Sequence, residues 1–222
     1  MRPFTAGPAR RLAKRLLRDS SGVSVIEFAY IVPIFATLGL LGTEIAWMST
    51  VNMQASQIAL SLADNASRLG QTDNSSVTPT ITEADVDSIM AGAMRQGASI
   101  NLGAQGRVVL SSLEYHKGTG KQYIHWQRCR GSLVRASAYG NDGANNGLGG
   151  TTIAGVGQSA TKVRAADGSA VMVAEVYYQY DGLFANMLSL EPMFRQEAVF
   201  AIRDDRNLAP GVTGTNGQSR CT

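Results

Sequence analysis

Few residues in this chain carry side chains that commonly catalyse reactions. The 222-residue sequence has two histidines, His116 and His125, and contains no nucleophile elbow, HExxH helix or Walker phosphate loop. Both histidines fall on predicted strands or beside a turn, where hydrogen-bonded or solvated histidines are common. Glu114, Asp167 and Glu175 cannot be paired from sequence alone. We therefore predict no catalytic residue, no metal site and no cofactor, and we expect that the protein is not an enzyme.

The two cysteines, Cys129 and Cys221, lie far apart and form no CxxC motif. One interpretation is two unrelated buried thiols. In an oxidising compartment, a single disulfide that ties the C-terminal tail to the domain is favoured. Closing so long a loop stabilises a fold by about 4 kcal/mol in the chain-entropy model, as an upper value. Zinc binding is not expected, because the histidines do not stand at ligand spacing from these thiols.

An acidic residue in an apolar segment is the feature that most needs an explanation. Glu27 precedes a run that is uncharged from Phe28 to Thr43 and ends at Glu44. A carboxylate inside a membrane helix costs about 2.5–3.5 kcal/mol on insertion scales, so it normally has a partner. One explanation is an interfacial glutamate that reaches toward the lipid headgroups.

The position of Gly22 offers a second explanation. Cleavage after Gly22 would make Val23 a free N-terminal amine and Glu27 the fifth residue of the mature chain. The ammonium group of one subunit could then pair with the Glu27 carboxylate of a neighbour. Such a pair neutralises both charges in a low-dielectric setting and fixes the register between subunits.

The residues around Glu27 predict a transmembrane helix with a defined orientation. The uncharged run of 16 residues becomes long enough to span a bilayer when Val23–Ile26 and Ile45–Met48 are added. The first 22 residues carry a net charge of +5, whereas the whole chain carries +3 and the remainder therefore −2. By the positive-inside rule the N-terminus is cytoplasmic and the chain beyond about Met48 is exported. Cleavage as a secretory signal is disfavoured, because large side chains follow the span where small ones are required.

The basic leader, Gly22, Glu27-Phe28 and the apolar helix together resemble the type IV prepilin signal. The longer string from Gly22 to Phe35, through Pro33, resembles the TadE/TadG-like proteins of tight-adherence pilus systems. Further along, similar strings are Trp126–Cys129, Glu175–Tyr180 with Leu183-Phe184, and Ala198–Arg203. The resemblance implies a minor pilin or pseudopilin that a membrane prepilin peptidase cuts between Gly22 and Val23. The implied partners are other pilin or pseudopilin subunits, the inner-membrane pilus assembly machinery and membrane lipid.

The alternative function is an uncleaved inner-membrane anchor that carries a periplasmic binding or scaffold domain. The relation between Gly22 and Glu27 favours the assembly subunit, because a simple anchor has no need for it. Nucleic-acid binding is not expected, since the excess of basic side chains lies in the leader. The expected location is the inner membrane, as a single-pass protein with a periplasmic C-terminal domain, or an extracellular pilus.

The remaining sequence predicts an α+β, pilin-like fold. Apolar residues at helical spacing predict one helix over residues 24–69, capped by Gly70. Thr82 predicts the start of a short helix that ends near Gly97. Alternating segments predict a small antiparallel sheet that packs against the upper half of the long helix. Its strands are expected over 107–115, 121–129, 170–180 and 197–203, with a hairpin turn over 117–120.

These elements divide the chain into a basic prepilin-type leader (1–22), a transmembrane plus amphipathic helix (23–70), a periplasmic α+β domain (71–205) and a flexible C-terminal tail (206–222). Residues 71–76 and 189–194 are expected to be connections. The segment 140–157, with seven glycines among eighteen residues, is predicted to be an exposed, mobile loop. It lacks the lysine of a phosphate loop, and Asp142 alone offers too few carboxylates for calcium.

Overall fold

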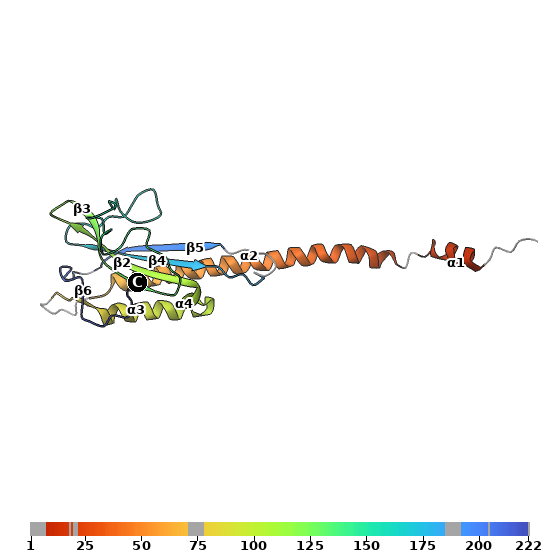
Figure 1. The fold of residues 1–222 in the computed structure, drawn as a ribbon, viewed down its shortest axis with the longest axis horizontal. Coiled ribbons are helices and arrows are strands. Elements are labelled where there is room, and N and C mark those ends of the chain that lie inside the picture. Colours follow the sequence, from red (N-terminus) through yellow and green to blue (C-terminus); the bar gives the residue numbers. More distant parts are fainter. Residues whose placement is uncertain are drawn as a thin grey trace, which may run out of the picture. The chain divides into compact units, whose positions relative to one another are not determined.

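Figure 1 shows the fold of the chain as a computed structural model. The structure describes residues 8–17, 19, 22–70, 78–184, 192–203 and 205–221. It divides into two compact units, Met1–Ala46 and Trp47–Thr222, which we describe separately and call the N-terminal unit and the domain. The connection predicted over 71–76 and the first three residues of that over 189–194 lie outside the described residues.

The N-terminal unit consists of α1, Pro8–Leu16, and the first part of α2, Val23–Ser67. Helix α1 was not predicted, whereas α2 matches the predicted helix over 24–69 closely. Gly70 follows α2 with a φ of +75°, the left-handed conformation that glycine adopts readily after a helix. Pro33 lies inside α2 without ending it, and the Thr37 hydroxyl donates a hydrogen bond to the Pro33 carbonyl at 2.8 Å.

The domain contains a second helix, α3, at Glu83–Gln96, followed by the 3-10 helix η1, Ala98–Ile100, and the one-turn helix α4, Leu102–Gln105. The predicted cap at Thr82 is confirmed. The Thr82 hydroxyl accepts from the Asp85 N–H at 3.2 Å, and the Asp85 carboxylate accepts from the Thr82 N–H at 3.0 Å. This reciprocal pair is a capping box, which satisfies two backbone donors at the helix start.

The predicted antiparallel sheet has four strands in the order β3-β2-β4-β5. The strands are β2 at Gly106–His116, β3 at Lys121–Arg130, β4 at Ala170–Gln179 and β5 at Met193–Ala201. The first three match the predicted strands to within one residue at either end. The predicted hairpin joins β2 to β3, and within it the Gly120 N–H donates to the His116 carbonyl at 2.9 Å.

The fourth strand begins earlier than predicted, at residue 193 rather than 197, and ends earlier, at residue 201 rather than 203. The pairing register with β4, in which Gln179 faces Met193, carries the strand back to that residue. Arg195 is charged and resembles a loop residue in the sequence. In the structure its side chain pairs with the buried carboxylate of Glu175 on β4, so a strand can contain it.

Apolar side chains cover both faces of the sheet. On one face the sheet packs against α2 and α3 in a core that includes Leu62 and Met172. On the other face Val173 packs with Ile153 and Val156. Successive residues of a strand point to opposite faces, so β4 contributes Met172 to the first core and Val173 to the second. The α+β class, with a long helix packed on a small antiparallel sheet, is therefore as predicted.

The glycine-rich segment 140–157 is only partly the exposed loop that we predicted. Ile153 is 7% exposed and Val156 is 0% exposed. Val156 and Val163 also exchange two backbone hydrogen bonds of 2.8 Å. The prediction was wrong for these residues because it weighed the glycines and overlooked two β-branched side chains whose burial completes the second core.

The C-terminal tail, predicted to be flexible over 206–222, packs on the domain. Strand β6, Val212–Thr213, pairs in parallel with β1, Ile81–Thr82. The Arg206 side chain donates to the carbonyls of Ala66 and Leu69 at 3.2 and 3.3 Å. Ala66 lies in the last turn of α2 and Leu69 lies two residues beyond the helix, a region where backbone acceptors commonly need partners from outside the helix. Polar contacts thus hold a segment whose composition is typical of disorder.

Candidate functional site

The predicted processing site and Glu27 lie together at the start of α2. The Ile26 N–H donates to the Gly22 carbonyl at 3.2 Å, which places Gly22 directly before the first helical turn. A Cβ added at Gly22 would meet nothing within 4 Å, so packing does not require glycine there. Val23 and Glu27 are both exposed, and their spacing of four residues puts them on the same face of the helix.

The first part of α2 presents apolar side chains on all sides. Among the described residues, α2 is the one helix long and apolar enough to cross a membrane, and no residue of its most apolar segment is buried. Phe28, Tyr30 and Phe35 are 68%, 74% and 70% exposed. Exposed apolar surface of this extent is typical of a helix that faces lipid or a partner. The Thr43 hydroxyl donates to the Gly39 carbonyl at 2.9 Å, so this polar side chain finds its hydrogen-bond partner within the helix.

Cys129 on β3 and Cys221 in the tail form a disulfide that spans 92 residues of sequence. Beside it, the Cys129 N–H donates to the Ser219 carbonyl at 2.8 Å. The Asp87 carboxylate on α3 accepts from the Gln218 N–H at 2.8 Å. The tail is therefore fastened to both β3 and α3, by one covalent bond and by backbone hydrogen bonds.

Glu175 is the centre of a buried polar cluster on the face of the sheet opposite α2. Its side chain is 0% exposed, and it lies 2.9 Å from the Arg195 guanidinium. The carboxylate also accepts hydrogen bonds from the Tyr177 hydroxyl at 2.8 Å, from the Ala138 N–H at 3.1 Å and from the Ser137 hydroxyl. A buried carboxylate is tolerated when it is paired and hydrogen-bonded in this way.

Tyr139 and Glu197 connect the Glu175 cluster to the glycine-rich segment. The Tyr139 hydroxyl donates to the Glu197 carboxylate at 2.7 Å and accepts from the Gly157 N–H at 2.9 Å. Burial, followed by the nearby Glu175 carboxylate, raises the pKa of Tyr177 to about 12, so its hydroxyl remains a donor at neutral pH. The cluster holds the segment against the sheet through satisfied polar contacts.

Glu114 is the centre of a second polar cluster, on β2 and β3. Its carboxylate lies 2.9 Å from His125 Nδ1 and accepts from the Ser112 hydroxyl at 2.9 Å and the Tyr123 hydroxyl at 3.3 Å. The hydrogen bond to Glu114, opposed in part by burial, raises the pKa of His125. Burial and the Glu114 charge raise the pKa of Tyr123 to about 12.

The other ionisable groups that the sequence analysis singled out do not join these clusters. His116 Nδ1 lies 2.9 Å from Thr119 Oγ1 in the hairpin turn. Asp167 pairs with Lys117 at 3.1 Å on the surface. In the β2–β4 ladder Glu175 faces Val109 while Glu114 faces Ala170, so these two carboxylates are five positions apart along the strands. They therefore do not form a carboxylate pair.

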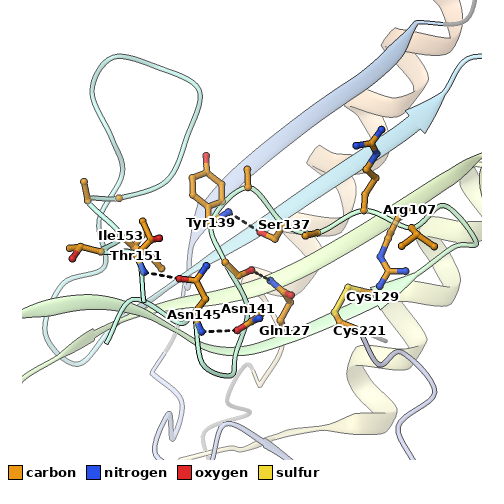
Figure 2. Close-up of a pocket in the computed structure, with 18 residues that line it drawn as sticks. Arg107, Gln127, Cys129, Ser137, Tyr139, Asn141, Asn145, Thr151, Ile153 and Cys221 are labelled. Atoms are coloured by element: carbon orange, nitrogen blue, oxygen red, sulfur yellow. Dashed lines mark hydrogen bonds between the residues drawn. A yellow bond between two sulfur atoms is a disulfide. The ribbon is translucent and has the colours of Figure 1, made fainter. Parts of the chain in front are cut away.

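A cleft of about 540 Å³ lies between β3, the disulfide and the glycine-rich segment (Figure 2). Three hydrogen bonds shape its polar wall: Gln127 Nε2 to the Gly140 carbonyl at 3.0 Å, the Asn145 N–H to Asn141 Oδ1 at 3.1 Å, and the Thr151 N–H to Asn145 Oδ1 at 2.8 Å. No histidine is among the described residues that line the cleft, and its two cysteines are bonded to each other. These walls offer hydrogen-bonding groups to a ligand rather than an activated thiol.

No group of three or more His, Cys, Asp or Glu side chains is arranged to hold a metal ion in the part of the chain that the structure describes. Asp142, considered for calcium, accepts a hydrogen bond from the Gln127 N–H at 3.0 Å and lies 3.6 Å from the Arg128 guanidinium. A carboxylate engaged in this way lacks the additional oxygen ligands that calcium requires.

Sequence reasoning missed three residues that organise the domain: Arg195, Tyr139 and Arg206. For Arg195 a local signal exists, because Arg195 and Glu197 stand two positions apart and therefore share one face of a strand. For Tyr139 and Arg206 the sequence carries no such signal, since their partners are distant in the chain. Comparison with known proteins found no match among protein-family models, curated proteins or solved structures.

Proposed function

We propose that this protein is a membrane-anchored assembly subunit of the pilin type, a minor pilin or pseudopilin that resembles the TadE-like proteins of tight-adherence pili. The observation that carries the proposal is Glu27, five residues after Gly22 and at the start of an exposed apolar helix. A helix that only anchors a domain inserts into lipid more favourably without this carboxylate. Pairing with an N-terminal amine offsets the cost.

In this proposal a prepilin peptidase cuts between Gly22 and Val23, and α2 crosses the inner membrane with the leader in the cytoplasm. The net charge of +5 in the leader supports this orientation. The disulfide supports an exported domain, because such bonds persist in oxidising compartments such as the periplasm. The mature subunit then stays in the inner membrane with the assembly machinery or enters an extracellular pilus.

The helix geometry favours pairing between subunits. Val23 and Glu27 lie one turn apart on the same exposed face of α2. When two parallel copies are shifted by four residues, or about 6 Å along the axis, the amine of one copy is level with the carboxylate of the other. One shift therefore satisfies both charges, and repeating it along a fibre gives a constant register.

The domain supports a structural role for the exported part of the chain. Two of its buried carboxylates, Glu175 and Glu114, are each engaged with a cation or histidine and with hydroxyl donors. Polar networks of this kind, with each member hydrogen-bonded, are typical of groups that hold a fold in one arrangement.

Mass spectrometry of the mature protein, extracted from the membranes of its own cells, tests the proposal. The wild-type chain should lack residues 1–22. Gly22→Ala should retain them, and because an added Cβ at Gly22 meets nothing within 4 Å, the loss of cleavage reports on the peptidase rather than on folding. Ser24→Ala, which leaves Gly22 and Glu27 in place, is the matched control and should be processed normally.

Glu27→Ala separates processing from assembly. This variant should still lose its leader but should enter pili poorly, because the amine of its neighbour has no carboxylate to pair with. Normal pili in a Glu27→Ala strain would disprove the charge pair. Recovery of Met1 from functional cells would contradict cleavage and favour the uncleaved, membrane-anchored binding or scaffold protein.

A further inference from the structure

The two edge strands of the sheet differ in what covers their backbones. β3 forms one edge and β5 the other. Along β3, three N–H groups that point away from β2 find acceptors in other segments: Ile124 donates to the Asn146 carbonyl at 2.8 Å, Gln127 to the Asp142 carboxylate at 3.0 Å, and Cys129 to the Ser219 carbonyl at 2.8 Å. The glycine-rich segment and the tail thus close this edge, as natural proteins commonly do.

In the part of the chain that the structure describes, no segment forms backbone hydrogen bonds with the outer edge of β5. The residues that flank β5, Pro192 and Ile202, each form a backbone hydrogen bond of 3.0 Å on the β4 side. Because peptide groups alternate in direction along a strand, Arg195, Glu197 and Val199 direct their N–H and C=O groups away from the sheet. Within the described part of the chain, no backbone or side-chain group bonds to these outward peptide groups.

α2 contacts β5 and the residues that follow it through polar side chains, Asn52 with Gln196 at 2.6 Å and Asp64 with Arg203, and it also exposes two apolar side chains. At the end of β5, the Arg203 N–H donates to the Ser67 carbonyl of α2 at 3.2 Å. Met53, Leu60 and Ser67 follow one another at intervals of seven residues, two helical turns, and therefore lie along one line of the helix. Met53 and Leu60 are 57% and 48% exposed, whereas Leu62 on the sheet-facing side is 1% exposed.

We propose that the outer edge of β5, with Met53 and Leu60 beside it, binds an extended segment of a different protein as an added β-strand. A row of unpaired backbone groups recognises an extended main chain, and the side chains at alternate positions supply the specificity. On the α2 side of the added strand those positions would meet Met53 and Leu60, so they should be apolar. On the opposite side they would lie near Arg195, whose side chain is 29% exposed, so they should be polar.

A second copy of this chain does not fit the same edge. Its β3 edge is already covered, so its own β5 would have to pair with β5 of the first copy, antiparallel and about a two-fold axis. β5 runs alongside the part of α2 that belongs to the domain (Figure 1). In a dimer related by this two-fold axis, the two α2 helices would therefore run in opposite directions. Chains anchored in one membrane through α2 cannot adopt that arrangement, a step that rests on the proposed function.

Hydrogen exchange at single-residue resolution tests the added strand. In the isolated full-length chain in detergent, the amides of Arg195, Glu197 and Val199 should exchange rapidly. In the assembly extracted intact from membranes they should exchange at least about tenfold more slowly. Val199→Pro removes one outward N–H but no hydrogen bond to β4, so it should abolish the protection of Arg195 and Glu197. Because the Val199 side chain also packs against the second core, the thermal midpoint should fall no further than in Val199→Ala. Ala198→Pro, the matched control, removes an inward N–H and should lower the midpoint.

A photo-crosslinker at Met53 in the full-length chain identifies the occupant. Cross-links to an extended segment of another protein, absent in Val199→Pro, would support the proposal. Cross-links only to lipid or to a second copy would overturn it, as would amides that exchange equally fast in the isolated chain and in the assembly. The N-terminus of the same sample is sequenced separately, so that a failure of the proposed function is distinguished from a failure of the strand site.

Discussion

The two halves of α2 have different surroundings although one helix contains both. In the first half Phe35 and Leu38 are 70% and 60% exposed, and their neighbours on every side are apolar. In the second half Ile58 and Leu62 are 2% and 1% exposed, because the sheet and α3 cover them. Polar residues such as Gln54 occupy the remaining faces of this half.

The difference lies in periodicity more than in the amount of apolar surface. Apolar residues on all sides suit a helix in lipid, whereas a stripe at intervals of three and four residues suits a helix that packs on one surface. The change of pattern falls near Trp47, where the chain also divides into its two units. Under the proposed function, the medium around the helix changes there, from lipid to protein and water.

Matched leucine truncations give the largest effect and the strongest test of this comparison. Leu62→Ala should lower the free energy of unfolding of the domain by roughly 3–5 kcal/mol, because it leaves a cavity in a closed core. Leu38→Ala should change it by less than about 0.5 kcal/mol, because exposed positions contribute little to domain stability. Denaturant unfolding of the full chain in detergent, followed by the fluorescence of Trp47 and Trp126, which both pack in the domain core, measures both. Equal losses would show that the two halves do not differ in this way.

Loss of the disulfide should have the next largest effect and should again be confined to the domain. Replacing Cys129 and Cys221 by serine frees the end of the tail, and we expect a loss of about 2–4 kcal/mol. The Arg206 contacts with the end of α2 remain and hold the start of the tail. Wild-type protein under reducing conditions should match the double variant in denaturant unfolding. A double variant as stable as oxidised wild type would mean that hydrogen bonds alone secure the tail.

The elements with a strong local signal were predicted well from the sequence. The uncharged apolar run and the apolar residues at helical spacing after it predicted α2. Thr82 and Asp85 predicted the start of α3, and alternating apolar residues predicted β2, β3 and β4. These signals depend on neighbours within about one or two turns, which the sequence displays directly. The spacing of Gly22 and Glu27 is also a local signal, and its role in processing and assembly stays a prediction.

The parts that were missed depend on contacts between distant residues. Arg206 bonds to Leu69, 137 residues away, and Arg195 bonds to Glu175 across 20 residues. A polar side chain that finds such a partner leaves no periodic pattern, so the tail was predicted to be flexible and the start of β5 to be a loop. The covered edge of β3 and the bare edge of β5 were unforeseen for the same reason, since the coverage of an edge depends on the tertiary fold.

The smallest effect that we predict is a pH dependence, and it too should belong to the domain alone. The hydrogen bond to Glu114, opposed by burial, raises the pKa of His125 above its usual value of 6.5. The folded state then holds the proton more tightly than the unfolded state. The stabilisation is fully present below about pH 6.5 and is lost as the pH rises through the folded-state pKa. The other charged or titratable groups near Glu114, Tyr123 and Arg206, do not change charge in this range.

Urea unfolding should therefore show that the free energy of unfolding of the domain falls between about pH 6 and pH 8. This decrease should be smaller than the decrease caused by Leu62→Ala. His125→Gln should flatten the slope, because glutamine can keep a hydrogen bond to Glu114 but carries no proton that titrates. The first half of α2 contains no histidine, so the stability effect of Leu38→Ala should be the same at about pH 6 and at about pH 8. Stability that rises with pH in wild type would show that burial outweighs the Glu114 contact at His125.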